Sequence, residues 1–454
     1  MGNRPRMARA ERGDASRPTV AATRDPFVAI ALVAAAALAV QLAVNVVASP
    51  AAGAMLVDDA YFFVRYAHHW RDHGVLAWNV GGPATHGITS LLHQLVVTAI
   101  VARTGHDDVL ALQLASNVAF ALAAAALACL ASVSVASEGN GGEGNGDRGL
   151  RRAAVALTLT TLATTPVLTL HARSGMDTGL ATFVATASLL LAIAVERTPN
   201  GALARSIVAW LPALAVVTHL ARPDLDLLCA GPFVALAIAG NERRLRLALG
   251  GAALALVATL VVLRLRLGTA LPLAAYVKHS ALWASDPGHA ATYRFEGVRE
   301  LGVFATATLP WLGVWALAGA PMPKLRALRG AICAAAAFVA YHALLTVPIM
   351  TFAARFYVPA LPAVVALAAV GVPRLALRER TAMFAWLALL VAGRGLVARD
   401  YVRAIIVEAR ALPASAHTPA GALEYVASRN VVWAGLSLLA RDLDAACRIA
   451  AFDD

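Results

Sequence analysis

The sequence has little charge, few aromatic residues and almost no cysteine for its length. Of its 454 residues, 14% are charged and 6% are aromatic, and only four are cysteines. Soluble domains carry about 25% charged residues, so this composition excludes a mainly soluble protein. The cysteines show neither paired nor metal-ligand spacing, which argues against a disulfide framework and against a zinc site. Aliphatic residues dominate instead, with 59% of the chain hydrophobic.

The net charge of +11 is the one feature that could suggest a nucleic-acid partner. The basic residues, however, occur in short clusters between apolar runs rather than along one stripe. That arrangement is typical of cytoplasmic loops of membrane proteins and of contacts with anionic lipid headgroups. We therefore expect membrane lipids as partners and no nucleic acid.

The apolar runs predict an all-α polytopic membrane protein with about eleven transmembrane helices, because about 20 apolar residues cross a bilayer. A basic, disordered cytoplasmic tail is predicted over 1–26, a transmembrane module over 27–398 and a short outer-face tail over 399–454. The expected spans are 27–48, 109–136, 153–171, 178–195, 206–220, 225–240, 247–263, 301–319, 328–349, 356–373 and 382–398.

Segment 87–103 is apolar but short and interrupted by polar residues. If it does not cross and the N-terminus is cytoplasmic, the basic clusters between the spans all face the cytoplasm, as the positive-inside rule requires. We therefore expect a juxtamembrane or re-entrant helix there. It belongs to a first outer loop over 49–108, and a second large outer loop covers 264–300. The predicted location is a bacterial inner membrane, with the functional residues on the outer, periplasmic face.

Acidic residues stand at the start of the first outer loop. Asp58 and Asp59 precede a segment whose spacing predicts an amphipathic helix that ends at Gly74. Such a pair can act as a general base, a metal ligand or an electrostatic clamp. The alternative is that the two acids only cap a helix start. On the same face this topology also places Arg173, Asp177, Arg222, Asp224, Lys278, His279 and Arg355.

Short motifs follow one another in order between residues 57 and 362. They are Asp58-Asp59-Ala60-Tyr61, Arg65-Tyr66-Ala67, Gly87-Ile88-Thr89-Ser90, Ser174-Gly175-Met176-Asp177-Thr178, Ala221-Arg222-Pro223-Asp224, the stretch from Gly268 to Lys278, and Arg355-Phe356-Tyr357-Val358-Pro359. The set resembles GT-C membrane glycosyltransferases, most closely the mycobacterial-type arabinofuranosyltransferase branch. Ile88, Asp177 and Asp224 depart from that branch, which has Tyr, Glu and Glu. The region 399–454 is much shorter than the outer domain of the mycobacterial enzymes.

The resemblance implies transfer of a sugar, such as arabinofuranose, from a polyprenyl-phosphate donor to a cell-envelope glycan or lipid acceptor, with inversion. It implies Asp58 as general base, with Asp59 orienting the acceptor or joining a metal. No cofactor is required, although a divalent cation (Ca²⁺, Mg²⁺ or Mn²⁺) could bind Asp58 and Asp59. Candidates for the donor phosphate are Lys278, Arg222, Arg355 and His279. Candidates for the acceptor or the cavity are Tyr61, Arg65, His86, Thr89, Asp177 and Asp224.

Other interpretations stay open. The sugar could be a hexose or an aminosugar, and the protein could instead be a lipid-linked-sugar flippase or a transporter. Transporters need ionisable groups near mid-membrane, whereas the predicted spans contain almost no Asp, Glu or Lys at their centres. The basic candidates could be interfacial side chains that reach toward headgroups. Asp177 and Asp224 could be helix caps, and Asp224 could also orient Arg222.

Overall fold

The computed structural model describes residues 26–47, 59–79, 81–104, 108–138, 145–240, 243–279, 287–346 and 352–375. Asp58, the predicted span 382–398, the predicted outer tail 399–454 and nearly all of the predicted basic tail lie outside these residues. Every regular element in the described part is a helix, as predicted.

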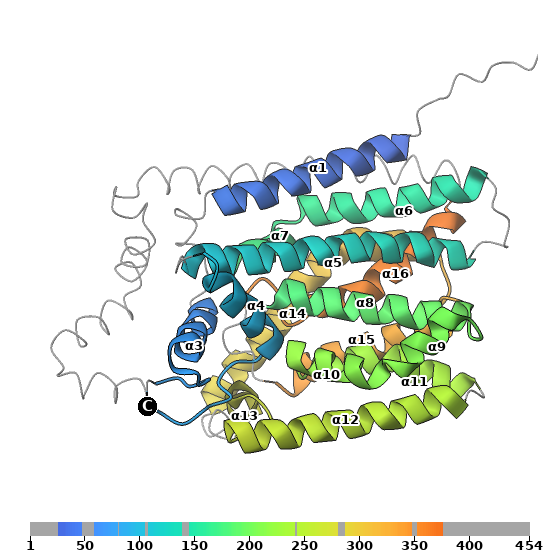
Figure 1. Cartoon of the computed structure of the whole chain (residues 1–454). Helices are drawn as coiled ribbons and strands as arrows, with labels where there is room; N and C mark the ends of the chain where they lie inside the picture. The colour runs from blue at the N-terminus through green and yellow to red at the C-terminus, as the bar shows by residue number, and fades with distance from the viewer. Residues whose placement is uncertain are drawn as a thin grey trace, which may run out of the picture.

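The helices form one elongated bundle in which most axes run in a similar direction (Figure 1). Their bounds are α1 Pro26–Val47, α5 Asp108–Glu138, α6 Asn145–Thr164, α7 Pro166–Arg173, α8 Thr178–Arg197, α9 Ala202–Ala209, α10 Leu211–Ala221, α11 Leu225–Ala239, α12 Arg243–Leu267, α14 Pro287–Leu317, α15 Arg326–Leu344 and α16 Leu361–Gly371. Each predicted span from 27–48 to 356–373 coincides with one helix or with a bent pair of helices.

Fewer of these helices are long enough to cross a bilayer than the eleven predicted. In the described residues five are long and apolar enough, or seven if the bent pairs α6–α7 and α9–α10 each count as one span. The difference arises because a span in this bundle can be broken or short: α11 has 15 residues and α16 has 11. Buried neighbours rather than lipid satisfy the polar groups at such breaks.

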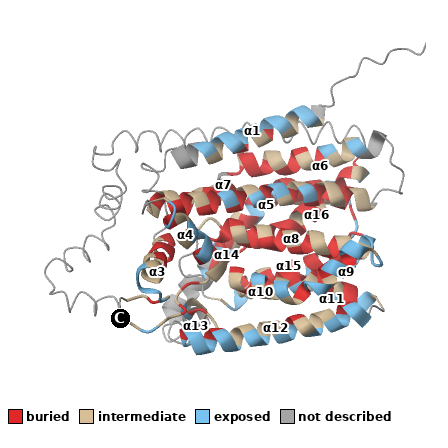
Figure 2. Cartoon of the chain, in the orientation of Figure 1, coloured by how far each residue is buried: buried red, intermediate tan, exposed pale blue. Residues whose placement is uncertain are grey.

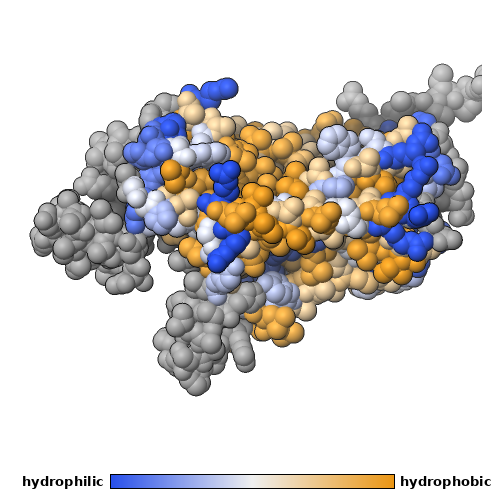
Figure 3. Space-filling view, turned by 60° about the horizontal axis from the view of Figure 1, so that its bottom comes forward, coloured by the Kyte–Doolittle hydropathy of each residue, from blue (hydrophilic) through white to orange (hydrophobic). Residues whose placement is uncertain are grey.

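Burial increases toward the middle of the bundle (Figure 2). Helix α5 packs against α6 and α8, and α16 packs against α14 and α5. In contrast, α12 lies at an edge, and few of its residues are buried. Figure 3 shows one face of the molecule, where an apolar surface separates hydrophilic side chains gathered at the two ends. This is the surface expected of a protein that spans a membrane.

Helices α11 and α15 approach each other especially closely. A Cβ atom added to Gly231 would lie 2.4 Å from the Cβ of Ala334, and one added to Gly330 would lie 2.6 Å from the carbonyl oxygen of Gly231. Small residues allow such contacts between membrane helices. The antiparallel register that they set brings the start of α11 beside His342 near the end of α15.

The first outer loop contains two short helices, α3 (Ala60–His73) and α4 (Leu91–Val101). Helix α3 ends at Gly74 as predicted. Helix α4 has 11 residues, so segment 87–103 contains a short helix, as predicted. Its first turn is capped by Ser90, whose Oγ accepts a hydrogen bond from the His93 N–H at 3.1 Å.

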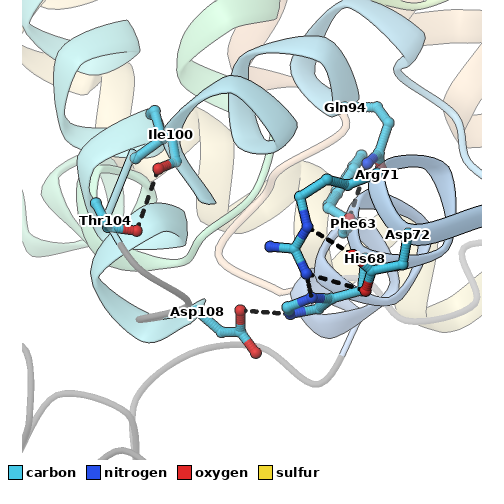
Figure 4. Close-up of polar contacts among 8 residues, drawn as sticks. All are labelled: Phe63, His68, Arg71, Asp72, Gln94, Ile100, Thr104 and Asp108. Carbon is cyan, nitrogen blue, oxygen red and sulfur yellow. Dashed lines mark hydrogen bonds and ion pairs between the residues drawn. The ribbon is translucent and has the colours of Figure 1, made fainter. Parts of the chain in front are cut away.

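Polar contacts fix α3 to its neighbours (Figure 4). Gln94 of α4 donates from Nε2 to the carbonyl oxygen of Phe63 at 2.8 Å. His68 Nε2 lies 2.8 Å from Oδ1 of Asp108, the first residue of α5, and Arg71 contacts the other nitrogen of His68. The start of α3, which carries Asp59, is therefore held by contacts along the rest of the helix.

Candidate active site

A cavity of about 850 Å³ opens at the end of the bundle that carries α3 and α13 (Leu273–His279). Its polar wall combines residues from sequence segments far apart: Thr89, Asp177, Arg222, Asp224, Asp226, Tyr341, His342, Thr346 and Arg355. Its apolar wall contains Pro223, Leu227, Leu271, Pro272, Ala274, Ala275 and Phe356, and Tyr276 completes the lining. Five of the residues predicted for the donor, the acceptor or the cavity thus line one space.

Arg222 and Asp224 form a buried ion pair in the turn between α10 and α11. Arg222 donates from Nε to Asp224 Oδ1 at 3.0 Å and from Nη2 to Oδ2 through a short contact. Pro223 lies between them and cannot donate a backbone hydrogen bond, so it suits a turn in which the helix ends. The expected role of Asp224 as a partner that orients Arg222 agrees with this geometry.

His342 extends the pair into a chain of three side chains. Its Nε2 lies 3.0 Å from Asp224 Oδ2. Burial alone would raise the pKa of Asp224, but the charge of Arg222 and the contact with His342 hold that pKa well below its usual range. Burial also opposes the charged form of Arg222, yet Asp224 and Asp177 outweigh it and raise the pKa of Arg222. Asp224 and Arg222 are therefore charged in the folded protein.

The second buried cation, Arg355, pairs with the acidic residue at the start of α3. Its Nη1 donates to Asp59 Oδ2 at 3.2 Å, across 296 residues of sequence. The guanidinium carbons of Arg355 and Arg222 lie 4.8 Å and 5.7 Å from the centroid of the Phe356 ring. His342 stacks on the same ring, with centroids 5.5 Å apart. Phe356 therefore gathers two arginines and a histidine around one point of the cavity wall.

A strained turn presents Arg355 to the cavity. Ala353 and Ala354 have φ values of 46° and 58°, a region that residues with a side chain seldom adopt. Surrounding contacts hold the turn: Ala354 N donates to Glu300 Oε2 at 2.6 Å, and His171 Nε2 lies 2.9 Å from the Ala353 carbonyl oxygen. Strained backbone persists where neighbours over-determine it, and such positions cluster at functional sites.

Three acidic residues occupy helix starts, but none caps its helix through the side chain. Asp59, Asp177 and Asp224 are the N-cap residues of α3, α8 and α11, and each lacks a capping hydrogen bond from its carboxylate. Asp59 and Asp224 bind arginines instead. Asp177 is only 3% exposed and lines the cavity, and its Oδ2 has no hydrogen-bond partner among the described residues. The capping alternative therefore does not account for these carboxylates.

A second acid–histidine pair stands beside the first. Asp226 lines the cavity, and its Oδ2 lies 2.8 Å from Nδ1 of His219, which is buried in α10. His86 is also buried, and burial lowers its pKa to about 4, so its ring is neutral at pH 7. The backbone carbonyl oxygen of His86 accepts a hydrogen bond from Leu273 N at 2.8 Å, which ties the first outer loop to α13.

Several predicted residues lie elsewhere. Arg65 donates to the Trp78 carbonyl oxygen at 2.7 Å and to Asn79 Oδ1 at 3.0 Å, and its guanidinium lies over the Trp78 ring. Tyr61 packs with the hydrophobic cluster of the first outer loop. Arg65, Tyr61 and His86 are absent from the cavity wall. Lys278 and His279 end α13, but their side chains, like all of Asp58, fall outside what the structure describes.

Sequence reasoning missed His342, Asp226 and Glu300. A usable signal existed for His342, because an ionisable residue inside an apolar run is uncommon and is often functional. These residues make contacts between separate elements: His342 of α15 with Asp224 before α11, Asp226 of α11 with His219 of α10, and Glu300 of α14 with the turn at 352–355. No local spacing predicts such contacts. Within the described residues no three His, Cys, Asp or Glu side chains converge as a metal site would require. The proposed cation at Asp58 and Asp59 lies partly outside them.

Comparisons with known proteins give the fold. No protein-family model matches the sequence, and no curated protein matches it. Two crystal structures of ArnT from Cupriavidus metallidurans are similar, each with a TM-score of 0.52 and 19% sequence identity. With the apo structure the match covers 82% of this chain and 63% of ArnT; with the structure bound to undecaprenyl phosphate it covers 92% and 72%. The chain spans less than two thirds of ArnT in the first comparison. The described helices therefore share the fold of ArnT.

Proposed function

We propose that this protein is a membrane glycosyltransferase that transfers a sugar from a polyprenyl-phosphate donor to a cell-envelope glycan or lipid. The observation that carries the proposal is the pair of buried arginines, Arg222 and Arg355, beside one aromatic ring in a cavity with an apolar wall. A lipid-linked sugar phosphate presents the complementary groups: an anionic phosphate, a polar sugar and a long apolar chain.

The cations suit the chemistry of the leaving group. When the bond between the anomeric carbon and the phosphate oxygen breaks, negative charge accumulates on the polyprenyl phosphate that leaves. Arginine binds phosphate through paired N–H groups, and fixed cations in a buried site stabilise developing charge strongly. Asp224 and Asp59 hold the two guanidinium groups in place. The ArnT structure bound to undecaprenyl phosphate supports a donor of this class.

The apolar side of the cavity suits the lipid. Leu271, Pro272, Ala274 and Ala275 precede or begin α13, next to the end of the edge helix α12. A prenyl chain that entered from the bilayer beside α12 would meet this wall first. Lys278 and His279, which follow these residues at the end of α13, are proposed as further contacts to the phosphate.

The acceptor needs a base. We propose that the carboxylate of Asp58 takes the proton of the acceptor hydroxyl while its oxygen attacks the anomeric carbon and polyprenyl phosphate leaves. A single in-line displacement of this kind inverts the anomeric centre. Asp177, buried with an unpartnered oxygen in the cavity, is proposed to bind an acceptor or sugar hydroxyl. A divalent cation at Asp58 and Asp59 and arabinofuranose as the sugar are further proposals.

The proposed setting is a bacterial inner membrane with the cavity on the periplasmic side. Support comes from the basic clusters, which are expected to face the cytoplasm. Spheroplasts of cells that express the protein with a protease-cleavable tag at residues 241–242 or at the N-terminus would test this orientation. Protection of these tags in intact spheroplasts agrees with the proposal, and cleavage from outside contradicts it.

The decisive experiment is product analysis. Purified protein in proteoliposomes is incubated with polyprenyl-phosphate pentoses, hexoses and aminosugars, together with envelope acceptors. Release of free polyprenyl phosphate in equal amount to glycosylated product supports the proposal, and Asp58→Asn is expected to abolish both while leaving protein yield unchanged. Movement of the intact lipid-linked sugar across the bilayer without its consumption would instead identify a flippase.

A further inference from the structure

The bundle has a second large cavity, which the proposed glycosyl transfer does not use. It measures about 730 Å³ and lies between the turn preceding α9, the bent pair α9–α10 and the first turns of α12. Its lining includes Arg205, Arg243 and Arg244 together with Val208, Pro212 and Leu247. The 54° bend between α9 and α10 opens the wedge against α12 that this cavity fills.

This groove lies at the opposite end of the membrane module from the candidate active site. Helix α12 joins the two: Arg243 is its first residue, and Leu271, four residues past its last, lines the active-site cavity. Its 25 residues extend about 37 Å at 1.5 Å per residue, which exceeds the hydrocarbon thickness of about 30 Å. Figure 1 shows the two ends of α12 at opposite ends of the bundle, so the two cavities face different leaflets of a bilayer that α12 crosses.

The three arginines of the groove are not neutralised by the described part of the protein. Arg205 donates only to the Asn200 carbonyl oxygen, at 3.3 Å, and none of the three forms an ion pair with a described carboxylate. The first N–H groups of α12 add positive potential at the same place. An anion near these groups would be stabilised both by the guanidinium charges and by the helix start.

The surface around the groove is one that meets lipid rather than water. Leu203, Trp210 and Leu247 are 62%, 69% and 65% exposed. Trp210 stands between the lining residues Ala209 and Pro212. Large exposed apolar side chains beside arginines are typical of the membrane–water interface, where acyl chains and headgroups meet. A small soluble anion has no apolar part that could contact these side chains, whereas a lipid has acyl chains.

We propose that the groove binds an anionic glycerophospholipid of the leaflet opposite the candidate active site. The lipid phosphate lies among Arg205, Arg243 and Arg244, and an acyl chain lies along Val208, Pro212 and Leu247. The site is separate from the proposed donor site and holds whether or not the proposed transfer reaction is correct.

The test uses Trp210 as a reporter at the groove. The protein is placed in phosphatidylcholine vesicles that contain a small fraction of brominated phosphatidylglycerol or of brominated phosphatidylcholine. The contribution of Trp210 to fluorescence quenching is the difference between the wild type and Trp210→Phe. We expect brominated phosphatidylglycerol to be enriched at Trp210 on the order of tenfold over phosphatidylcholine, since each interfacial arginine attracts anionic lipid appreciably. Equal quenching by the two lipids would overturn the proposal.

Three variants separate a groove from a generally basic surface. Arg244 lines the groove, whereas Arg246, two residues later on the same helix, is exposed and does not line it. Arg244→Gln should lower the preference severalfold and the triple variant R205Q/R243Q/R244Q should remove it, while Arg246→Gln should leave it nearly unchanged. An equal loss of the phosphatidylglycerol preference in Arg244→Gln and Arg246→Gln would indicate attraction to the basic surface as a whole and overturn the proposal.

Two further measurements need no arginine variants. Raising the salt concentration should weaken the wild-type preference only modestly if the phosphate sits in the groove, because sheltered pairs are screened less than exposed charges. Unlabelled polyprenyl phosphate is added as a competitor. If it restores Trp210 fluorescence at lower concentration than unlabelled phosphatidylglycerol, the occupant is a prenyl phosphate and the assignment to a glycerophospholipid is wrong.

Discussion

The two ends of the bundle use arginine in opposite ways. At the active-site end, Arg222 and Arg355 are 5% exposed, and each is bonded to a carboxylate. At the other end, Arg205, Arg243 and Arg244 are exposed around an open groove. A buried charge is stable only when it is paired and oriented, whereas an exposed charge needs no fixed partner. The buried end therefore has fixed cations, as the proposed transfer requires, and the exposed end has charges that pair with no described carboxylate and lie beside apolar side chains, as the proposed lipid site requires.

The largest test of this difference is removal of one cation from each end. Arg222→Gln leaves Asp224, whose side chain is only 16% exposed, without its main counter-charge, so the free energy of unfolding should fall by about 2–4 kcal/mol. Transfer activity should be lost even in the folded fraction. Arg243→Gln, at the other end, should change the free energy of unfolding by less than about 0.5 kcal/mol. Thermal unfolding in detergent measures the stability of both variants. Similar losses of stability in the two variants would contradict the proposed difference between the two ends.

Acid should weaken the active-site end through His86. Because burial lowers the pKa of folded His86 to about 4, against about 6.5 in an unfolded chain, the unfolded state binds the proton more tightly. Stability is therefore complete above about pH 6.5 and falls as the pH drops toward 4, by up to about 3 kcal/mol in total.

The check on this prediction is the unfolding midpoint between pH 7 and pH 4.5, compared for the wild type and His86→Gln. The variant should be less sensitive to acid over this range. A variant with the full wild-type slope would show that another group is responsible.

The helix register behind the buried cluster can be tested at Gly231. An alanine there would place its Cβ 2.4 Å from that of Ala334, so α11 and α15 must separate. We expect a loss of stability of about 1–3 kcal/mol and a weaker contact between Asp224 and His342. Gly250→Ala, on the edge helix α12 where an added Cβ meets nothing within 4 Å, should be neutral or slightly stabilising. If Gly231→Ala is as harmless as Gly250→Ala, the close approach does not position the site.

A smaller effect is expected at the turn that presents Arg355. Glu300→Ala leaves the N–H of Ala354 without its acceptor, which should cost about 1–2 kcal/mol and raise the KM for the donor more than it lowers kcat. Arg299→Ala removes only an exposed side chain, whose Nη2 lies 3.4 Å from Glu300 Oε1, and should change both values much less than Glu300→Ala. A fall in kcat with an unchanged KM would argue that the turn does not position a donor-binding group.

The sequence predicts most of the helices but only part of the site. The contacts that it predicts and those that it does not differ in how far apart their residues lie along the chain. The pairing of Arg222 with Asp224 could be predicted from the sequence because the residues are two positions apart in one turn. The contact between Asp59 and Arg355 was not, because it depends on how α3 docks on a turn 296 residues later. Helix capping was a fair alternative for Asp59, Asp177 and Asp224, since each occupies an N-cap position; only side-chain geometry shows that none of them caps.

The same contrast explains the residues that were placed wrongly or missed. Arg65 was expected at the acceptor or cavity, but its neighbours Trp78 and Asn79 bind it within its own loop. His342 was missed because it lies within an apolar span, and its partner comes from another helix. Local spacing thus predicts helices and short-range pairs, while the cavity arises from the register between helices.

The most direct test of the central claim is to locate the phosphate-bearing end of a polyprenyl phosphate on the protein. A photoreactive analogue with its label next to the phosphate is cross-linked to the purified protein, and the adducts are mapped by mass spectrometry. We expect adducts within residues 222–227, 271–276 and 352–356, and their loss in the folded fraction of the double variant R222K/R355K. Adducts confined to residues 199–212 and 243–251 would place the lipid phosphate at the other end of the molecule and rule out a donor site at Arg222 and Arg355.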